Sequence, residues 1–298
     1  MTGRERRAAL SAGIFLAPAL VLIAVFFFLP VLAALLLSFT DFDLYALGDL
    51  NRLRFVGFAN YLQLLQSPLF WTALGNTFYF VVVGGPLSVA VSLGAALLVN
   101  SRLTRFPGFF RAAFFLPVVT TLVAVAVVWR YLYHPRYGLL NYGLSLIGIE
   151  PIDWLGDPAW AIPAIILMAV WKNFGFNMII FIAGLQNIPA QLYEAARIDG
   201  ASPWRQFRHI TLPLLGPTFL FVALMTMIGY FQVFAEPYVM TQGGPANRTL
   251  SVVLLMYEEG FRWWNMGYAS AAAFVLFALI LAATVLQLRL RRKQVQDG

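Results

Sequence analysis

The stretch EAARIDGASPWRQFRHITLP, residues 194–213, places charged and titratable side chains in the middle of an otherwise apolar chain. Gly200 stands where a helix commonly ends in a left-handed residue, a conformation that glycine adopts without steric cost. Ser202 followed by Pro203 is a typical N-cap and first-turn pair. The pattern predicts a helix over residues 189–199, a tight bend at Gly200 and a second helix that begins at once.

The composition of the whole chain indicates a membrane protein. Of its 298 residues, 61% are hydrophobic and 11% are charged, whereas soluble domains average roughly 25% charged residues. No water-soluble fold of this length has a core large enough for so much apolar surface. The chain has no cysteine, which excludes disulfides and thiolate metal sites. Its net positive charge comes without a basic patch interleaved with aromatic residues, so we expect no nucleic-acid partner.

Windows of about 20 apolar residues locate the membrane-spanning helices. They predict six spans, at residues 14–38, 76–99, 112–132, 159–186, 212–235 and 268–289. The first span is too long for the core of a signal peptide and is expected to remain as a helix. Prolines and glycines inside the spans make kinks plausible, but breaks are not required, because neighbouring helices can satisfy the freed backbone groups.

Charges between the spans predict the orientation, since Lys and Arg near helix ends stay on the cytoplasmic side. Cations concentrate in the N-terminus, the second and fourth connections and the tail: Arg4, Arg6, Arg7, Arg102, Arg105, Arg111, Arg197, Arg205, Arg208, Arg289, Arg291, Arg292 and Lys293. The other connections collect acids, among them Asp41, Asp43, Asp49, Glu150, Asp153 and Asp157. The sequence therefore predicts an all-α membrane protein with both termini, and the segment 187–213, in the cytoplasm.

The predicted bend carries a surface of small side chains, namely Ala195, Ala196, Gly200 and Ala201. A helix that lies on lipid would instead present large apolar residues. Small side chains suit the close approach of another protein, which favours a docking element. An ordinary interfacial helical loop remains the alternative.

Polar side chains at membrane depth are costly and tend to face a bundle interior or a water-filled path. A candidate solute path is formed by Thr121, Asn173, Phe176, Asn177, Tyr230 and Gln232. Neutral donors and acceptors beside aromatic rings suit a sugar, whose hydroxyls need hydrogen bonds and whose C–H faces pack on rings. The alternative is that these residues hydrogen-bond neighbouring helices.

The charged segment resembles the EAA loop of permease subunits in bacterial ABC importers. The resemblance rests on Glu194-Ala195-Ala196, Asp199-Gly200-Ala201, Phe207, Ile210 and Leu212-Pro213. More narrowly, the chain is similar to the first permease of the carbohydrate-uptake branch, the maltose and glycerol-phosphate type, also at Trp154–Pro158 and Thr241–Pro245. The resemblance covers nearly the whole chain, although some relatives carry extra N-terminal spans and a large external domain that this chain lacks.

The resemblance implies the type I importer permease fold, with residues 1–298 as one permease domain in the inner membrane and 187–213 as its coupling loop. It implies that Glu194, Ala195, Ala196, Asp199, Gly200 and Phe207 insert into a cleft on an ATPase subunit. The implied partners are a second homologous permease, two ATPase subunits that bind ATP and Mg²⁺, and an extracytoplasmic solute-binding protein. Asn173 and Tyr230 fall near the family's central site.

Independent observations restrict the chain's own role. Neither of its lysines, Lys172 and Lys293, follows a glycine, so it has no phosphate-binding G-x-x-x-x-G-K-[ST] loop. We expect no enzyme activity, bound cofactor or metal, because metal-ligand spacings are missing and His134 and His209 lie in separate loops. A stand-alone secondary transporter or channel is the alternative function, although an intramembrane acid relay or inverted repeats would be expected there. Lys172 could pair with the second permease or with an anionic solute, so phosphorylated sugars remain an alternative solute class.

Overall fold

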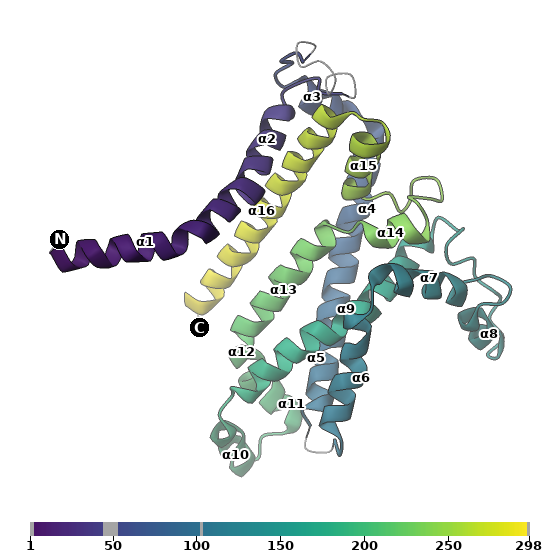
Figure 1. Ribbon diagram of the computed structural model, residues 1–298. Coiled ribbons are helices and arrows are strands. Elements are labelled where there is room, and N and C mark those ends of the chain that lie inside the picture. The colour runs from purple at the N-terminus through teal and green to yellow at the C-terminus, as the bar shows by residue number, and fades with distance from the viewer. Residues whose placement is uncertain (1–2, 44–52, 102–103, 297–298) are drawn as a thin grey trace. The chain divides into compact units, whose positions relative to one another are not determined.

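The computed structural model describes residues 3–43, 53–101 and 104–296 (Figure 1). Regular structure in these ranges is helical, apart from one isolated bridge between Thr40 and Phe55. Arg102 and Asp49, two of the charges that predict the orientation, lie outside the described ranges. Contacts divide the chain into two compact units, Met1–Ser67 with Met256–Phe277, and Pro68–Leu255 with Ala278–Gly298.

The first unit contains α1 (Gly3–Ile23), α2 (Leu29–Leu37), α3 (Ala59–Gln66) and the start of α16 (Met266–Gln296). A π-helical turn, Ala24–Phe28, makes α1 and α2 continuous. Asn60 donates from its Nδ2 to the carbonyls of Ser38 at 2.9 Å and Thr40 at 2.8 Å. Gly267 lies directly against the Thr40 carbonyl, where a side chain would not fit. The end of α2, α3 and the start of α16 are thereby joined.

Asp41, which follows α2, forms an ion pair with Arg54. The Arg54 backbone N–H donates to one carboxylate oxygen at 2.7 Å and its Nε to the other at 2.8 Å. These hydrogen bonds, the backbone one above all, hold the pKa of Asp41 below its usual value. The Arg54 side chain is largely exposed, so this ion pair contributes little to overall stability.

Four helical segments are long and apolar enough to cross a membrane: Gly13–Leu37, Pro68–Val99, Ala161–Gln186 and Met266–Leu290. They coincide with four predicted spans, although the second begins earlier than predicted. That second segment comprises α4 (Pro68–Tyr79), a π-helical turn Phe80–Gly84 and α5 (Gly85–Val99). The third segment is α9 (Ala161–Gln186).

The two remaining predicted spans are bent pairs of helices. Helices α6 (Pro107–Val119) and α7 (Leu122–Leu132) meet at 98°, and Pro203–Leu214 meets α13 (Gly216–Phe231) at 68°. The described residues therefore contain four candidate spans, or up to six if each bent pair counts as one. The sequence indicated kinks without a need for breaks, and the structure differs, because both predicted helices are interrupted.

The break between α6 and α7 is stabilised by side chains. Thr120 and Thr121 adopt extended backbone angles there, which frees carbonyl groups near the end of α6. The Thr120 hydroxyl donates to the Pro117 carbonyl at 2.6 Å. Lys172 of α9 is buried and donates from Nζ to the carbonyls of Pro117 and Val118, both at 3.4 Å. Irregular backbone is tolerated at membrane depth where such partners exist.

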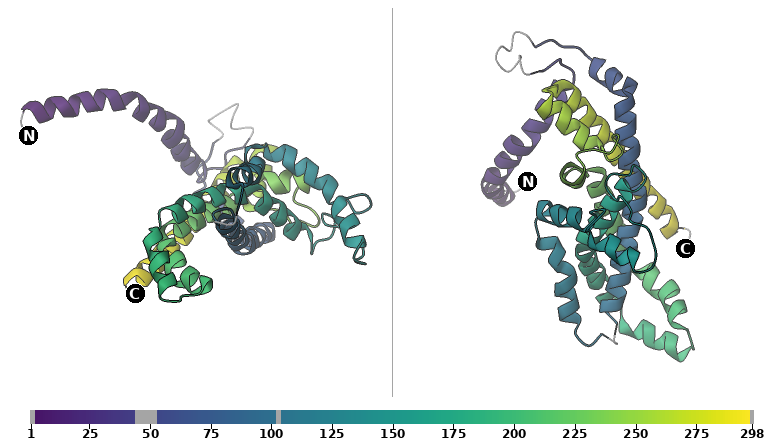
Figure 2. Two further views of the ribbon diagram at one scale, coloured as in Figure 1. Left: turned by 90° about the horizontal axis from the view of Figure 1, so that it is seen from below. Right: turned by 90° about the vertical axis from the view of Figure 1, so that its right-hand side faces the viewer.

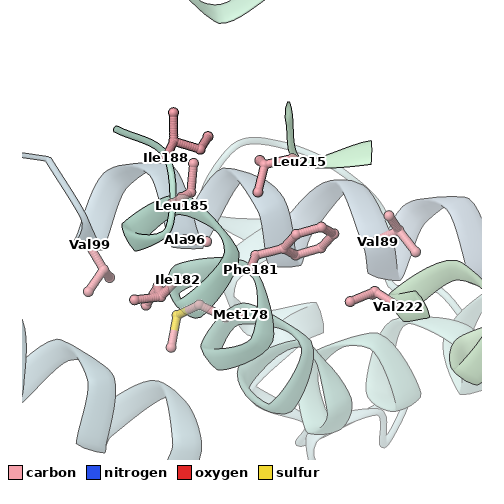
Figure 3. Packing of buried hydrophobic residues seen from close by; sticks show 10 residues of the cluster. All are labelled: Val89, Ala96, Val99, Met178, Phe181, Ile182, Leu185, Ile188, Leu215 and Val222. Carbon is pink, nitrogen blue, oxygen red and sulfur yellow. The ribbon is translucent and has the colours of Figure 1, made fainter. Parts of the chain in front are cut away.

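Helix α9 lies in the middle of the second unit, with α5 and α6 along it (Figures 1 and 2). Its residues Met178 and Phe181 are fully buried. Figure 3 shows these and other apolar side chains packed together, from α5, α9, α13 and the residues that flank α9 and α13: Val89, Ala96, Val99, Met178, Phe181, Ile182, Leu185, Ile188, Leu215 and Val222. Close van der Waals packing of this kind holds helices together in lipid.

The two ends of α9 carry different structures (Figure 1). One end leads into α10 (Ala190–Ile198) and α11 (Pro203–Gln206). The other end contacts α7 and α14 (Ala235–Met240), and α8 (Leu139–Ser145) lies beyond α7. The second unit also contains most of α15 (Val252–Tyr257). The segment that the sequence singled out and the loops on the opposite side are thus separated by the length of one spanning helix.

Asn141 organises the loop before α9. Its Nδ2 donates to the carbonyls of Pro135 at 3.2 Å and Ile152 at 2.8 Å, and its Oδ1 accepts from the Ile152 N–H and from Trp154 Nε1. The side chain is almost completely buried. The Trp154–Pro158 stretch is therefore a structural element fixed by a buried amide, a role that its sequence did not reveal.

Candidate solute chamber and coupling segment

The second unit contains a partly open chamber of about 510 Å³, lined mainly by α9, α13 and the turn into α14, with Ser88 of α5 and Val118 of α6. Five of the six predicted solute-path residues line it: Asn173, Phe176, Asn177, Tyr230 and Gln232. Thr121 does not. It lies exposed at the break before α7, where its carbonyl accepts the Val125 N–H at 3.1 Å. The structure thus brings together side chains from two helices far apart in the sequence.

The polar groups of the chamber differ in whether they have partners. Asn177 donates to the Thr226 hydroxyl at 3.0 Å, which joins α9 to α13. Among the residues that the structure describes, the buried hydroxyls of Ser88 and Tyr230 have no hydrogen-bond partner. The Tyr230 hydroxyl lies near Ser88 and Asn173 without forming a hydrogen bond of standard geometry. A buried polar group without a partner is costly, and both residues line the chamber.

Two residues of the second span position the Tyr230 ring. Phe80 packs edge-on against it, with ring centroids 5.1 Å apart. Gly84 faces the same ring so closely that an added Cβ would lie 3.0 Å from Tyr230 Cε2 and 3.4 Å from a methyl group of Ile166. The missing side chain at Gly84 therefore makes room for the ring.

The wall of the chamber at the turn into α14 is supported from behind. Ser251 donates to the Val233 carbonyl at 2.6 Å and accepts the Leu254 N–H at 3.1 Å. Asn76 of α4 donates to the carbonyls of Asn247 at 2.7 Å and Leu250 at 3.0 Å. Sequence reasoning missed these residues. Asn76 could have been recognised more easily than Ser251, because it is a polar amide within an apolar helix.

The predicted bend at Gly200 is confirmed. Gly200 has a φ of +71°, Ala201 N–H donates to the Ala196 carbonyl at 2.8 Å, and Gly200 N–H donates to the Arg197 carbonyl at 3.1 Å. These two bonds form a Schellman motif. Ser202 caps the second helix by accepting the Arg205 N–H at 3.4 Å. At the other end, Pro189 is the N-cap of α10 rather than a first-turn residue.

Further bonds make the bent segment compact. The hydroxyls of Tyr193 and Thr211 are 2.9 Å apart, which joins α10 to a π-helical turn, Phe207–Thr211. Gln206 donates from Nε2 to the Ala201 carbonyl at 2.8 Å. The helix then continues through α12 (Leu212–Leu214) to the bend before α13. Residues 187–213 therefore form a compact, bent unit stabilised by internal hydrogen bonds, which we call the knob.

The six predicted coupling residues lie on this knob with different exposure. Glu194, Ala195, Asp199 and Gly200 are exposed, whereas Ala196 and Phe207 are half-buried. The Phe207 ring packs on Trp204, with centroids 5.5 Å apart. Large apolar side chains are exposed beside the small ones, with Ile198 87% and Trp204 67% exposed. The sequence analysis did not include Ile198 and Trp204 among the coupling residues, although large apolar residues within a charged segment could have indicated them.

Comparison with known proteins identifies the family. Residues 9–296 match the family described as binding-protein-dependent transport system inner membrane component. The chain belongs to this family. It is therefore a multi-pass permease subunit of a binding-protein-dependent ABC importer in the inner membrane, and the permease itself carries out no catalysis.

Individual relatives match along their whole length. The permease is 39% identical to the lactose transport system permease protein LacF of Rhizobium radiobacter, over 94% of each chain. It is 37% identical to the trehalose/maltose transport system permease protein MalF of Thermococcus litoralis, covering 92% of this chain and 91% of that one. A chain of a bacterial alginate ABC transporter, crystallised with an alginate pentasaccharide-bound periplasmic protein, superimposes with a TM-score of 0.82 at 23% identity, covering 97% and 96% of the two chains.

We expect Gly84→Val to impair transport by displacing the Tyr230 ring, because the new side chain would overlap it. Uptake by the permease in its assembled transporter should fall several-fold while the amount of inserted protein stays the same. The matched control is Gly85→Ala, since an added Cβ at Gly85 meets no atom within 4 Å. Equal uptake by Gly84→Val and Gly85→Ala would show that the ring position does not matter.

Proposed function

We propose that this permease passes a sugar or a related polyol from an extracytoplasmic binding protein across the membrane. The observation that carries the proposal is the chamber, in which the unpartnered hydroxyls of Ser88 and Tyr230 lie beside Asn173 and the ring of Phe176. Neutral hydrogen-bonding groups next to an aromatic face match the hydroxyls and the C–H face of a sugar ring. The printed names of the relatives, lactose and trehalose/maltose permeases, support the same solute class.

The competing function, a stand-alone secondary transporter or channel, has less support. Membership of a binding-protein-dependent family argues against a protein that works alone. The polar residues of the chamber are mostly neutral, and a proton-coupled transporter would be expected to carry a chain of titratable groups.

The sugar proposal predicts the behaviour of two chamber variants. In proteoliposomes that contain the complete transporter and its binding protein, uptake of lactose, trehalose and maltose would be measured. Tyr230→Phe and Asn173→Ala should each weaken uptake of the accepted sugar by about 2- to 13-fold, the effect of losing one neutral hydrogen bond of about 0.5–1.5 kcal/mol. Tyr142→Phe is the control, because Tyr142 is 64% exposed and does not line the chamber. Unchanged uptake in both chamber variants would mean that these residues only hold helices together.

We further infer the type I importer architecture, in which the chain is a single permease domain with six spans and both termini in the cytoplasm. Six spans result if each bent helix pair crosses the membrane once. The cationic side chains support the orientation. Most of them lie in the N-terminus, the second and fourth connections and the tail, which all fall on the same side of six spans. In this arrangement the knob at residues 187–213 faces the cytoplasm and the loop fixed by Asn141 faces outward.

Single cysteines test this orientation directly, because the native chain contains none. In intact cells, Asp153→Cys should react with a membrane-impermeant thiol reagent, whereas Ala201→Cys should react only after the cells are permeabilised. Both positions are at least partly exposed, so accessibility is not limited by burial. Labelling of position 201 from outside would refute the proposed topology.

We propose that the knob docks on an ATPase subunit, and that the functional assembly pairs this chain with a second homologous permease, two ATPases that bind ATP and Mg²⁺, and a binding protein. The exposed Ile198 and Trp204 side chains support docking, because apolar surface in a water-facing segment is favourably covered by a partner. Small residues beside them let a partner surface approach closely, and Glu194 and Asp199 provide polar groups at its edge.

Gly200→Val tests this docking role. Because an added Cβ at Gly200 meets no atom within 4 Å, the expected defect comes only from the left-handed backbone, which a β-branched residue strongly disfavours. The variant should still insert, but the ATPase that co-purifies with it and the solute-stimulated ATP hydrolysis should fall together. Gly200→Ala should be milder. Ile198→Asp should weaken co-purification without altering the bend. Normal co-purification with both Gly200→Val and Ile198→Asp would contradict docking at the knob.

A further inference from the structure

A second cavity lies in the same unit as the chamber, and the two share no lining residue. Its volume is about 710 Å³, and it is bordered by one face of α4, the start of α9 and the turn after α14. The stretches Trp154–Pro158 and Thr241–Pro245 both lead to it, because Asp157 belongs to the first and Arg248 follows the second by three positions. We call it the outer pocket, since the proposed topology turns these segments outward.

Helix α4 contributes two aromatic rings to the outer pocket. Trp71, Gly75 and Tyr79 follow one another at intervals of four residues, so they share a face of the helix. The side chains of Trp71 and Tyr79 are 53% and 44% exposed. Between them, an added Cβ at Gly75 would meet no atom within 4 Å. The pocket therefore has open space between two rings whose flat apolar faces suit the C–H face of a sugar.

The polar side of the outer pocket carries opposite charges that do not neutralise each other by contact. Asp157 and Arg248 both line it, and neither takes part in the ion pairs found in the described ranges. One carboxylate oxygen of Asp157 accepts the Ala159 N–H at 2.8 Å. An ion in the pocket would be attracted by one group and repelled by the other. A hydroxyl group both donates and accepts, so a neutral ligand with several hydroxyls can use both.

Arg248 is carried by a strained turn. Ala246 and Asn247 have φ angles of +48° and +59°, which residues other than glycine adopt rarely. The Asn76 amide of α4 holds the Asn247 carbonyl, and the Arg248 N–H donates to the Pro245 carbonyl at 2.9 Å. Strain of this kind persists only where surrounding structure maintains it, and it concentrates at functional sites. The turn thus holds Arg248 in a defined place at the pocket.

We propose that the outer pocket is a second saccharide site, separate from the chamber. A neutral sugar packs against Trp71 and Tyr79, and its hydroxyls bind Asp157 and Arg248. The volume lies within the range of about 300–1,000 Å³ that is usual for small-molecule sites. This inference rests on the proposed sugar-permease function and adds a binding site to it.

A single cysteine in the pocket reports its occupancy, because the native chain contains none. Thr72 lines the outer pocket and is exposed. Thiol labelling of Thr72→Cys would be followed in the purified transporter in detergent, without binding protein, in the presence of lactose, trehalose or maltose. A saturating concentration of a transported sugar should slow labelling at least about threefold, since a bound ligand shields the site according to its occupancy. Tyr142→Cys, on α8 and outside the pocket, should label at an unchanged rate.

Further substitutions in the Thr72→Cys background separate this site from the chamber. Gly75→Leu should abolish the protection by filling the pocket, whereas Gly143→Leu should keep it, because Gly143 also has open space around its Cβ position but lies on α8. Arg248→Gln should raise the sugar concentration for half-protection by about 2- to 13-fold, the effect of weakening one hydrogen bond. Tyr230→Phe in the chamber should change it by no more than about twofold, as expected for independent sites.

The outcomes distinguish this site from the function on which it rests. A sugar that is taken up by proteoliposomes but does not slow labelling of Thr72→Cys would overturn the outer site and leave the proposed function standing. Full protection in Gly75→Leu would also overturn it. Protection by sugar-free binding protein, with none by sugar alone, would replace the saccharide site with a protein-docking surface. Absence of uptake of all three sugars would instead contradict the proposed sugar function.

Discussion

A peptide group inside a bilayer has no water to bind, so each interruption of a helix there needs partners from the protein itself. This constraint governs the break between α6 and α7, where the chain bends by 98°. Thr120 and the buried Lys172 supply donors to the carbonyls at the end of α6. Val118, one of these carbonyl residues, also lines the chamber. Lys172, which the sequence analysis linked to an anionic solute, therefore has a structural role at the helix break beside the chamber.

Local patterns were sufficient for some features and insufficient for others. The bend of the knob was predictable, because Gly200 and the Ser202-Pro203 pair determine backbone angles within a few residues. The break at Thr120 was not, since its donor Lys172 lies 54 or 55 positions away from the carbonyls it binds. Likewise, only the fold of the turn after α13 shows that Glu236 lines the chamber.

Asparagine and hydroxyl side chains serve two distinct purposes in this permease. Asn141 makes four hydrogen bonds within a loop, and Asn76 and Asn177 each join separate segments. The hydroxyls of Ser88 and Tyr230 are buried without such bonds. Composition alone does not separate the two groups, because both appear in the sequence as polar residues among apolar ones. The two groups differ only in the folded chain, where the first has hydrogen-bond partners and the second has none. The first group stabilises the fold, and the second is a candidate for contact with solute.

The knob connects two helices that line the chamber. Helix α9 runs directly into α10, and the helix after the Gly200 bend leads into α13. Both α9 and α13 contribute walls to the chamber. The hydroxyl contact between Tyr193 and Thr211 braces the two sides of the knob against each other. The knob therefore connects two chamber walls through the backbone itself, so a displacement of the knob would act on both walls, directly along α9 and across the 68° bend before α13.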